Sequence, residues 1–246
     1  MGFLSTAVNT KVLNRFGIDI RRHRSPAIIQ ILNYFSFDTV IDVGANIGQF
    51  AISILKNGFQ GDIFSIEPSS EAFNKLVAES KRYQKWHVIP RCALGAFKGD
   101  AKLNLSANSY SSSILDILPM HTRAAPESTY ISEESVIMET LDGLFAFDSA
   151  HGRNCLLKLD VQGFEDRVLA GGKRLLERIG GIKIELSILQ LYAEQSLHGE
   201  LISSLEEYGF SLWNLEPGFS DEISGQTFQY DAVLIHSSLL KESNAN

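Results

Sequence analysis

Short β-rich runs alternate with helical patterns along most of the sequence after residue 38. The run "VIDV", Val40 to Val43, leads through a glycine turn into a helix, and "DIFSIE", ending at Glu67, leads into the helix "SEAFNKLVAESKRY". "WHVIPRCAL" indicates a third strand, and "CLLKLDV", "GFEDRVLAGGKRLLERI" and "GIKIELS" repeat strand, helix and strand. This rhythm is typical of a parallel sheet with crossover helices. The sequence therefore predicts an α/β fold.

Two regions depart from the alternation. "FSLWNLE" and "TFQYDAVLIHS" are strand patterns separated by a stretch too short for a helical crossover, so we expect them to pair antiparallel. Residues 99–139 hold alternating patches, "AKLNLSA" and "SVIMETL", around a Ser-rich segment without a clear helix. We expect an irregular insertion there that acts as a lid or substrate wall. We expect residues 1–38, with a helix over Ser5–Phe16, to form an N-terminal helical extension to a main domain over 39–246.

Charge and cysteine content narrow the classes of partner. A formal net charge of -7 repels phosphate backbones, so nucleic acid is not an expected partner. Cys92 and Cys155 show no metal-ligand or disulfide spacing. No apolar run approaches the ~18 residues that a membrane span needs, and no signal core begins the chain. We expect a cytoplasmic protein without stable membrane insertion.

The glycine turn "VGANIGQF" lies where open α/β sheets bind nucleotide-like ligands. Glu67 ends the next strand, 19 residues beyond Gly48, about where a carboxylate accepts hydrogen bonds from ribose hydroxyls. The alternative is that the glycines only form a tight turn and that Glu67 caps a helix. Asn46 stands where a dinucleotide fingerprint requires glycine, which favours S-adenosylmethionine over NAD. Asp42 could hold the amino group of its methionine tail, directly or through water.

Several motifs together resemble the FkbM family of S-adenosylmethionine-dependent methyltransferases over about Val40 to His236. They are "VIDVGANIGQF", "IEPSSEAF", "CALG", "NSYSSSIL", "METLDGL", "LLKLDVQGFEDRVLAGG", "IKIELS" and "YDAVLIH". The resemblance implies a Rossmann-like class I methyltransferase fold: a seven-stranded, mostly parallel sheet with an antiparallel last strand and helices on both faces. It also implies methylation of a hydroxyl on a sugar, glycan or natural product. The alternatives are a non-catalytic scaffold subunit of the same fold and an NAD-dependent oxidoreductase.

The resemblance also assigns roles to single residues. The glycine turn would line the methionine end, Glu67 the ribose, and Ala93 and Leu94 the adenine, while Asp160 would face the methyl group. Family members usually carry Glu where this chain has Gln162. The expected cofactor-binding residues are Asp42, Gly44, Ala45, Asn46, Gly48, Glu67, Pro68, Ala93, Leu94 and Asp160.

Three residues are candidates for catalysis. Asp160 and Glu185 each end a core strand on the same edge of the sheet, and we expect them to serve as general base and acceptor-positioning group. The plainer alternatives are a helix cap for Asp160 and a salt-bridged strand end for Glu185. His121 in the insertion is the third candidate, against a solvated loop histidine. Lys158 shares the side of the strand that carries Asp160, either as an ion-pair partner or in the active site.

One Asp and one Glu make a weak metal signature, so we expect no metal. The expected partner is a small-molecule or glycan acceptor. The sequence leaves open whether the protein forms a homo-oligomer.

Overall fold

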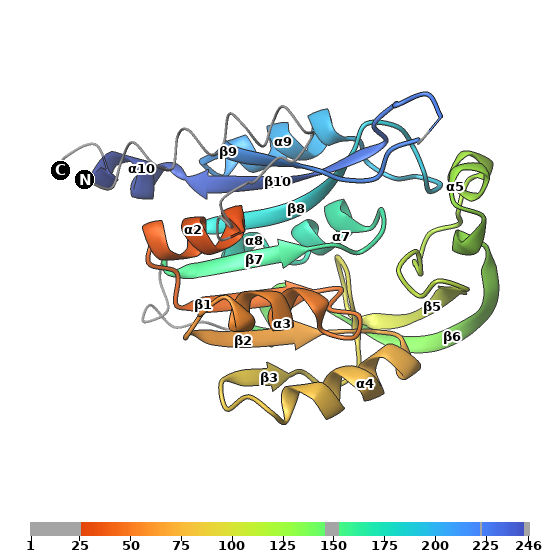
Figure 1. Cartoon of the computed structure of the whole chain (residues 1–246), viewed down its shortest axis with the longest axis horizontal. Coiled ribbons are helices and arrows are strands. Elements are labelled where there is room, and N and C mark those ends of the chain that lie inside the picture. Colours follow the sequence, from red (N-terminus) through yellow and green to blue (C-terminus); the bar gives the residue numbers. More distant parts are fainter. Residues whose placement is uncertain (1–25, 146–152, 222, 244–246) are drawn as a thin grey trace, which may run out of the picture.

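A seven-stranded sheet forms the centre of the protein (Figure 1). The computed structural model describes residues 26–145, 153–221 and 223–243. The strand order is β3-β2-β1-β7-β8-β10-β9, and only β10 runs against its neighbours, so the predicted antiparallel last strand is confirmed. The strands of this sheet are β1 (Thr39–Val43), β2 (Asp62–Ile66), β3 (Trp86–Val88), β7 (Cys155–Leu159), β8 (Gly181–Ser187), β9 (Phe210–Pro217) and β10 (Gln229–His236).

Helices cover both faces of this sheet and enclose two cores. One core packs Leu156 against α2 (Ala27–Tyr34), α3 (Gln49–Lys56) and α4 (Ser70–Ser80), and α10 (Ser237–Ser243) adds to it. The other packs Leu157 against helices that include α6 (Leu141–Leu144), α7 (Glu165–Ala170), α8 (Lys173–Leu176) and α9 (His198–Glu207). Leu156 and Leu157 enter different cores because successive strand residues point to opposite faces. All five residues of β1 and of β7 are buried, as expected of central parallel strands.

A second, three-stranded sheet lies beyond the carboxyl ends of the central strands, at the right of Figure 1. It consists of β4 (Ala93–Leu94), β6 (Tyr130–Glu139) and β5 (Gly99–Ser106) in that order, and α5 (Pro119–Ala124) and the 3-10 helix η1 (Pro126–Ser128) join β5 to β6. The expected irregular insertion over 99–139 is therefore wrong in its main part. The alternating pattern is that of a strand with one buried face: Val136 and Met138 are buried, and Ile137 between them is exposed.

The single strand expected over Trp86 to Leu94 is split between the two sheets. β3 pairs with β2, whereas β4 pairs with β6. Pro90, between the two, has no N–H for a strand ladder, so the chain leaves the large sheet there.

The single helix expected over residues 163–179 is also divided, into α7 and α8. The break falls at Gly171 and Gly172. A Cβ atom at Gly171 would lie 2.0 Å from the carbonyl oxygen of Gly95, so the chain turns where only glycine fits against the loop before β5.

Part of the N-terminal segment belongs to the domain core. Ile28, Ile31 and Leu32 of α2 are buried against the sheet. We therefore propose that the main domain begins with α2 and not at residue 39. The helix expected over Ser5–Phe16 lies outside the described residues. Among the residues that are described, no helix has both the length and the apolar character needed to cross a membrane.

Candidate active site

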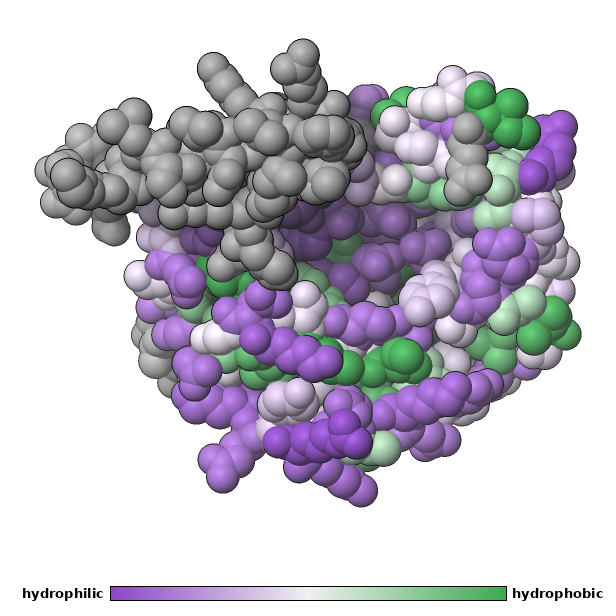
Figure 2. Space-filling view, viewed as in Figure 1, coloured by the Kyte–Doolittle hydropathy of each residue, from purple (hydrophilic) through white to green (hydrophobic). Residues whose placement is uncertain are grey.

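A cavity of about 380 Å³ lies between the carboxyl edge of the large sheet and the small sheet. This volume is within the range of small-molecule sites. Its walls come from the ends of β1, β2 and β7, from β8 and β10, and from the segment between β5 and α5. Figure 2 shows that this face of the molecule is hollowed near its centre, with mainly hydrophilic residues around the hollow.

The glycine turn after β1 owes its two glycines to packing within the protein. Gly44 has φ +70°, and a Cβ atom there would lie 1.8 Å from the carbonyl oxygen of Asp160. Gly48 has φ +93°, and a Cβ atom there would lie 2.5 Å from the Trp86 ring. Gly48 thus faces Trp86 and does not line the cavity, which corrects its expected place at the cofactor. Gly44, Ala45 and Asn46 do line it.

Glu67 connects this turn to the start of α4. Its Oε2 accepts a hydrogen bond from the backbone N–H of Asn46, and its Oε1 accepts one from the backbone N–H of Ser69, both at 2.8 Å. Burial raises the pKa of Glu67 to about 7, even though both hydrogen bonds favour the ionised form. Each carboxylate oxygen keeps a further lone pair for a ligand hydroxyl, since it accepts only one of these bonds.

An apolar slot adjoins Glu67. Pro68, Ala93 and Leu94, which are expected to bind the cofactor, line the cavity together with Cys92 and Phe164. Burial, with a smaller contribution from Glu139, raises the pKa of the Cys92 thiol to about 11, so this thiol stays protonated at neutral pH. A carboxylate beside a group of apolar side chains suits a nucleoside, because the ribose is polar and the flat faces of the base pack on apolar groups.

Asp42 does not reach the cavity, which corrects its expected direct contact with a ligand. Its Oδ1 lies 3.2 Å from Nζ of Lys158, whose ammonium group also donates to the carbonyl oxygen of Gly44 at 3.0 Å. Lys158 lines the cavity and Asp42 lies behind it, with a fully buried side chain. Burial lowers the pKa of Lys158, but the charges of Asp42 and Asp160 outweigh it and raise the pKa overall, so Lys158 stays charged.

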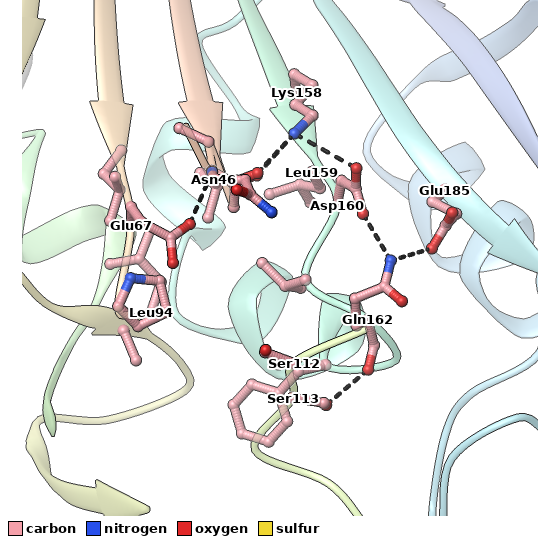
Figure 3. A pocket seen from close by; sticks show the side chains of 18 of the residues that line it. Asn46, Glu67, Leu94, Ser112, Ser113, Lys158, Leu159, Asp160, Gln162 and Glu185 are labelled. Carbon is pink, nitrogen blue, oxygen red and sulfur yellow. Dashed lines mark hydrogen bonds and ion pairs between the residues drawn. The ribbon is translucent and has the colours of Figure 1, made fainter. Parts of the chain in front are cut away.

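Asp160 and Glu185 lie together at the cavity, as the sequence predicted, and Gln162 joins them (Figure 3). Nε2 of Gln162 donates to Oδ1 of Asp160 and to Oε2 of Glu185, each at 2.9 Å. Oδ2 of Asp160 lies 3.6 Å from Nζ of Lys158. The Asp160 side chain is 41% exposed, so it is accessible from the cavity.

Glu185 is held in a more enclosed and more negative environment. Its Oε2 also accepts a hydrogen bond from Nε2 of Gln229 at 2.8 Å. Burial, together with the charges of Asp160, Glu165 and Asp231, raises the pKa of Glu185 well above its usual value. Asp160 and Glu185 are thus two adjacent carboxyl groups in different environments, an arrangement that separates acid and base roles.

His121 does not lie at the cavity, which corrects its place among the catalytic candidates. It is buried on α5, with ring centroids 5.2 Å from Tyr192 and 5.4 Å from Phe219. Burial lowers the pKa of His121 to about 4, so the ring is neutral at physiological pH. The "LPMH" segment belongs to a short helix, and the inner side of this helix packs the His121 ring among aromatic residues. The sequence around His121 gave no sign of this packing, because the aromatic residues that contact the ring are distant in the chain.

The Ser-rich segment after β5 forms one wall of the cavity. Ser109, Tyr110, Ser112 and Ser113 line it, together with Ile114. Oγ of Ser113 donates to the carbonyl oxygen of Gln162 at 2.7 Å. Nδ2 of Asn46 donates to the carbonyl oxygen of Ser109 at 3.2 Å, so the wall is attached at both ends of the cavity.

Sequence reasoning missed two charged residues that line the cavity. Nζ of Lys183 on β8 pairs with Asp231 on β10 and lies 3.2 Å from Glu216 on β9. Lys183 and Asp231 both line the cavity beside Glu185. The sequence did contain a signal for Lys183, because this residue is two positions before Glu185 and so faces the same side of the strand. Within the described residues, no group of three His, Cys, Asp or Glu side chains is placed to hold a metal ion.

The sequence of residues 42–212 matches the model of the methyltransferase FkbM domain. The chain belongs to the FkbM methyltransferase family. The match covers the glycine turn, the Glu67 strand end and the Asp160 to Glu185 region, so every residue that lines the cavity except Asp231 lies inside the family domain. No curated protein matches the sequence.

The chain is similar to several solved structures at low sequence identity. Methyltransferase FkbM from Methylobacillus flagellatus KT is 14% identical, with a TM-score of 0.50 over 79% of this chain and 43% of that chain, so this chain spans less than half of that protein. Magnesium protoporphyrin IX methyltransferase from Synechocystis PCC 6803, with bound S-adenosylmethionine, is 9% identical (TM-score 0.45; 96% and 85% covered). A putative tRNA (m1A22) methyltransferase from Streptococcus pneumoniae, in complex with S-adenosylmethionine, is 11% identical (TM-score 0.45; 87% and 73% covered). Of these three, only the first reaches a TM-score of 0.50, and at 14% identity its likeness shows the fold alone.

Proposed function

We propose that this protein is an S-adenosylmethionine-dependent O-methyltransferase that acts on a hydroxyl of a sugar, glycan or natural product. The supporting observation is the cavity itself, whose lining joins Glu67 and the apolar residues beside it to the carboxylates of Asp160 and Glu185. Membership of the FkbM methyltransferase family supports the transfer of a methyl group. The choice of a hydroxyl acceptor rests on the family resemblance and on the proton acceptors at the far end of the cavity.

The residues present fit the cofactor at three points. Glu67 offers two carboxylate oxygens for ribose hydroxyls, and charge-assisted bonds of this kind contribute about 1.5–3 kcal/mol each. Pro68 and Leu94 offer an apolar surface for the adenine. Oδ1 of Asn46 is buried and has no partner among the described residues, so it is a ready acceptor for an N–H of the ligand.

For the chemical step, the protein must align the methyl donor with the acceptor hydroxyl and must provide a group that accepts the hydroxyl proton. When bound, S-adenosylmethionine supplies a methyl group that its sulfonium has already activated. Asp160 lies at the end of β7 with one oxygen held by Gln162 and the other facing Lys158, and we assign it the role of general base for the acceptor hydroxyl. Glu185 positions the acceptor from the neighbouring strand. Alignment of reactants contributes about 7–11 kcal/mol, and a positioned base adds about 10²–10⁴-fold.

Ligand binding tests the cofactor part of this proposal. S-adenosylhomocysteine should raise the melting temperature of the protein, and isothermal titration should give saturable one-site binding, whereas NAD should give neither. Glu67→Ala should remove most of the shift, and Glu71→Ala, on the exposed side of α4, should keep it. Binding of NAD with no binding of S-adenosylhomocysteine would overturn the proposal.

A further inference from the structure

The carboxamide of Gln162 occupies the space between the two carboxylates of the proposed acceptor site. Its two N–H groups are directed at different strands, one at Asp160 after β7 and one at Glu185 on β8, each at 2.9 Å (Figure 3). Gln162 itself has φ +55°, a left-handed conformation that is uncommon for a residue with a side chain. Such a conformation persists only where the surroundings hold it.

Tyr192 determines which way the amide points. The Tyr192 hydroxyl, which is fully buried, donates to Oε1 of Gln162 at 2.7 Å. The opposite orientation would place an amide oxygen against two carboxylates and would remove the donor group that they share. The Gln162 backbone is also held, because its carbonyl oxygen accepts from Ser113 at 2.7 Å. Both ends of this residue are therefore anchored before any ligand enters.

The charges around the pair explain why a donor is needed there. Asp231 on β10 adds a third carboxylate to the same end of the cavity, and Lys183 is already paired with Asp231 and Glu216. Lys158 lies 3.6 Å from Asp160 but also serves the fully buried Asp42. Two adjacent carboxylates repel unless a cation, a proton or a hydrogen-bond donor lies between them.

We propose that Gln162 is a positioning residue that does with two N–H donors what a bound cation would do, so that Asp160 and Glu185 stay side by side without a metal. The role of this pair rests on the proposed function. The bridging role itself concerns only the free protein, and it can be tested without cofactor or acceptor.

Replacement of the amide by a carboxylate tests this role directly. Gln162→Glu places three carboxylates around one point and removes both donors, so the variant should gain a divalent-cation site. Gln229→Glu is the matched control: Gln229 donates to the same oxygen of Glu185 at 2.8 Å from β10, and the change in charge is identical. In the described structure Gln229 makes no hydrogen bond to Asp160.

Calorimetric titration with MnCl2 should show no saturable binding up to about 1 mM for the wild-type protein, which is the weak end of protein cation sites. Gln162→Glu should bind Mn²⁺ at least about tenfold more tightly than Gln229→Glu, a difference of about 1.4 kcal/mol. The melting temperature of Gln162→Glu, lowered relative to wild type, should be restored by the ion. Saturable binding by wild type, or equal binding by the two variants, would overturn the proposal.

A second variant keeps the test decisive if Gln162→Glu does not fold. Gln162→Met keeps the length of the side chain and removes both donors. The pKa of Glu185, followed by NMR of its carboxyl carbon, should rise further in this variant, because the lost bond favoured the ionised form. An unchanged Glu185 titration would show that Gln162 only fills space and would also overturn the proposal.

Discussion

Lys158 and Asp42 lie directly opposite each other on neighbouring central strands and form a buried ion pair, with Nζ 3.2 Å from Oδ1. The Lys158 side chain is 8% exposed and that of Asp42 is not exposed at all. The pair stands between the core and the cavity floor, since Lys158 lines the cavity and Asp42 does not. Lys158 therefore presents a fixed positive charge at the floor of the cavity.

Removal of the lysine alone should be costly. Lys158→Met leaves the Asp42 carboxylate buried without its cation, and broken pairs of this kind cost about 3–5 kcal/mol. Urea unfolding should show this loss in the free energy of unfolding. The double variant Asp42→Asn with Lys158→Met should lose less than Lys158→Met, because the unpaired charge is gone. A double variant that loses the sum of both single effects would contradict the coupling.

Cofactor affinity should depend on pH through Glu67. The pKa of this carboxyl is raised to about 7, so the ionised form, which is the better acceptor for two hydroxyls, is present above pH 7 and lost below it. Affinity for S-adenosylhomocysteine should therefore rise by about tenfold from pH 6 to pH 8. Titration calorimetry at both pH values measures this. Glu67→Gln should bind more weakly and with a nearly flat pH profile, and a profile as steep as that of wild type would assign the titration to another group.

The raised pKa of Glu67 changes the stability of the free protein with pH in the direction opposite to its effect on cofactor affinity. Because the folded pKa of Glu67 lies above the ordinary value of 4.5, its contribution to stability is complete below pH 4.5 and is lost as the pH rises through 7. Tighter cofactor binding and lower stability of the free protein should therefore appear together between pH 6 and pH 8. Urea unfolding of the free protein at these two pH values measures the second effect.

Gly44 should tolerate no side chain, whereas another glycine with positive φ should tolerate one. Gly44→Ala brings a Cβ atom onto the Asp160 carbonyl oxygen and should cost about 3 kcal/mol or more. Gly58 has φ +96°, and a Cβ atom there would meet no other atom within 4 Å, so Gly58→Ala should cost only the conformational strain, about 1 kcal/mol. Thermal unfolding of the two variants compares them, and equal losses would show that backbone strain alone decides.

Asp160→Asn should separate binding from turnover. The asparagine oxygen can still accept from Gln162, so affinity for S-adenosylhomocysteine should stay within about threefold, while methylation of the acceptor should fall by about 10²–10⁴-fold. Transfer of a radiolabelled methyl group to a panel of glycans and hydroxylated metabolites measures the second effect. If turnover persists in Asp160→Asn but is lost in Glu185→Gln, the base is Glu185.

Local sequence patterns were sufficient to predict the central sheet of this protein and the edge that carries the candidate site. The alternation of strands and helices predicted the parallel sheet, and the short connection before β10 predicted its reversed direction. Glu67, Asp160 and Glu185 were placed at one edge because the carboxyl ends of parallel strands meet there. These features depend on residues close in sequence or on rules that hold for every open α/β sheet, so they were readable from the chain alone.

Tertiary structure decided what each polar side chain contacts. Asp42 is hidden because Lys158 comes from a strand more than 100 residues later, and His121 is buried because Tyr192 and Phe219 pack on it. The pairing of β5 with β6 gave order to a segment that looked irregular, since an exposed and a buried face appear only when two distant runs align. The bridge through Gln162 likewise needs three segments at once. Local sequence carries periodicity and turn chemistry, but the partner of a buried charge is set by packing between distant parts of the chain.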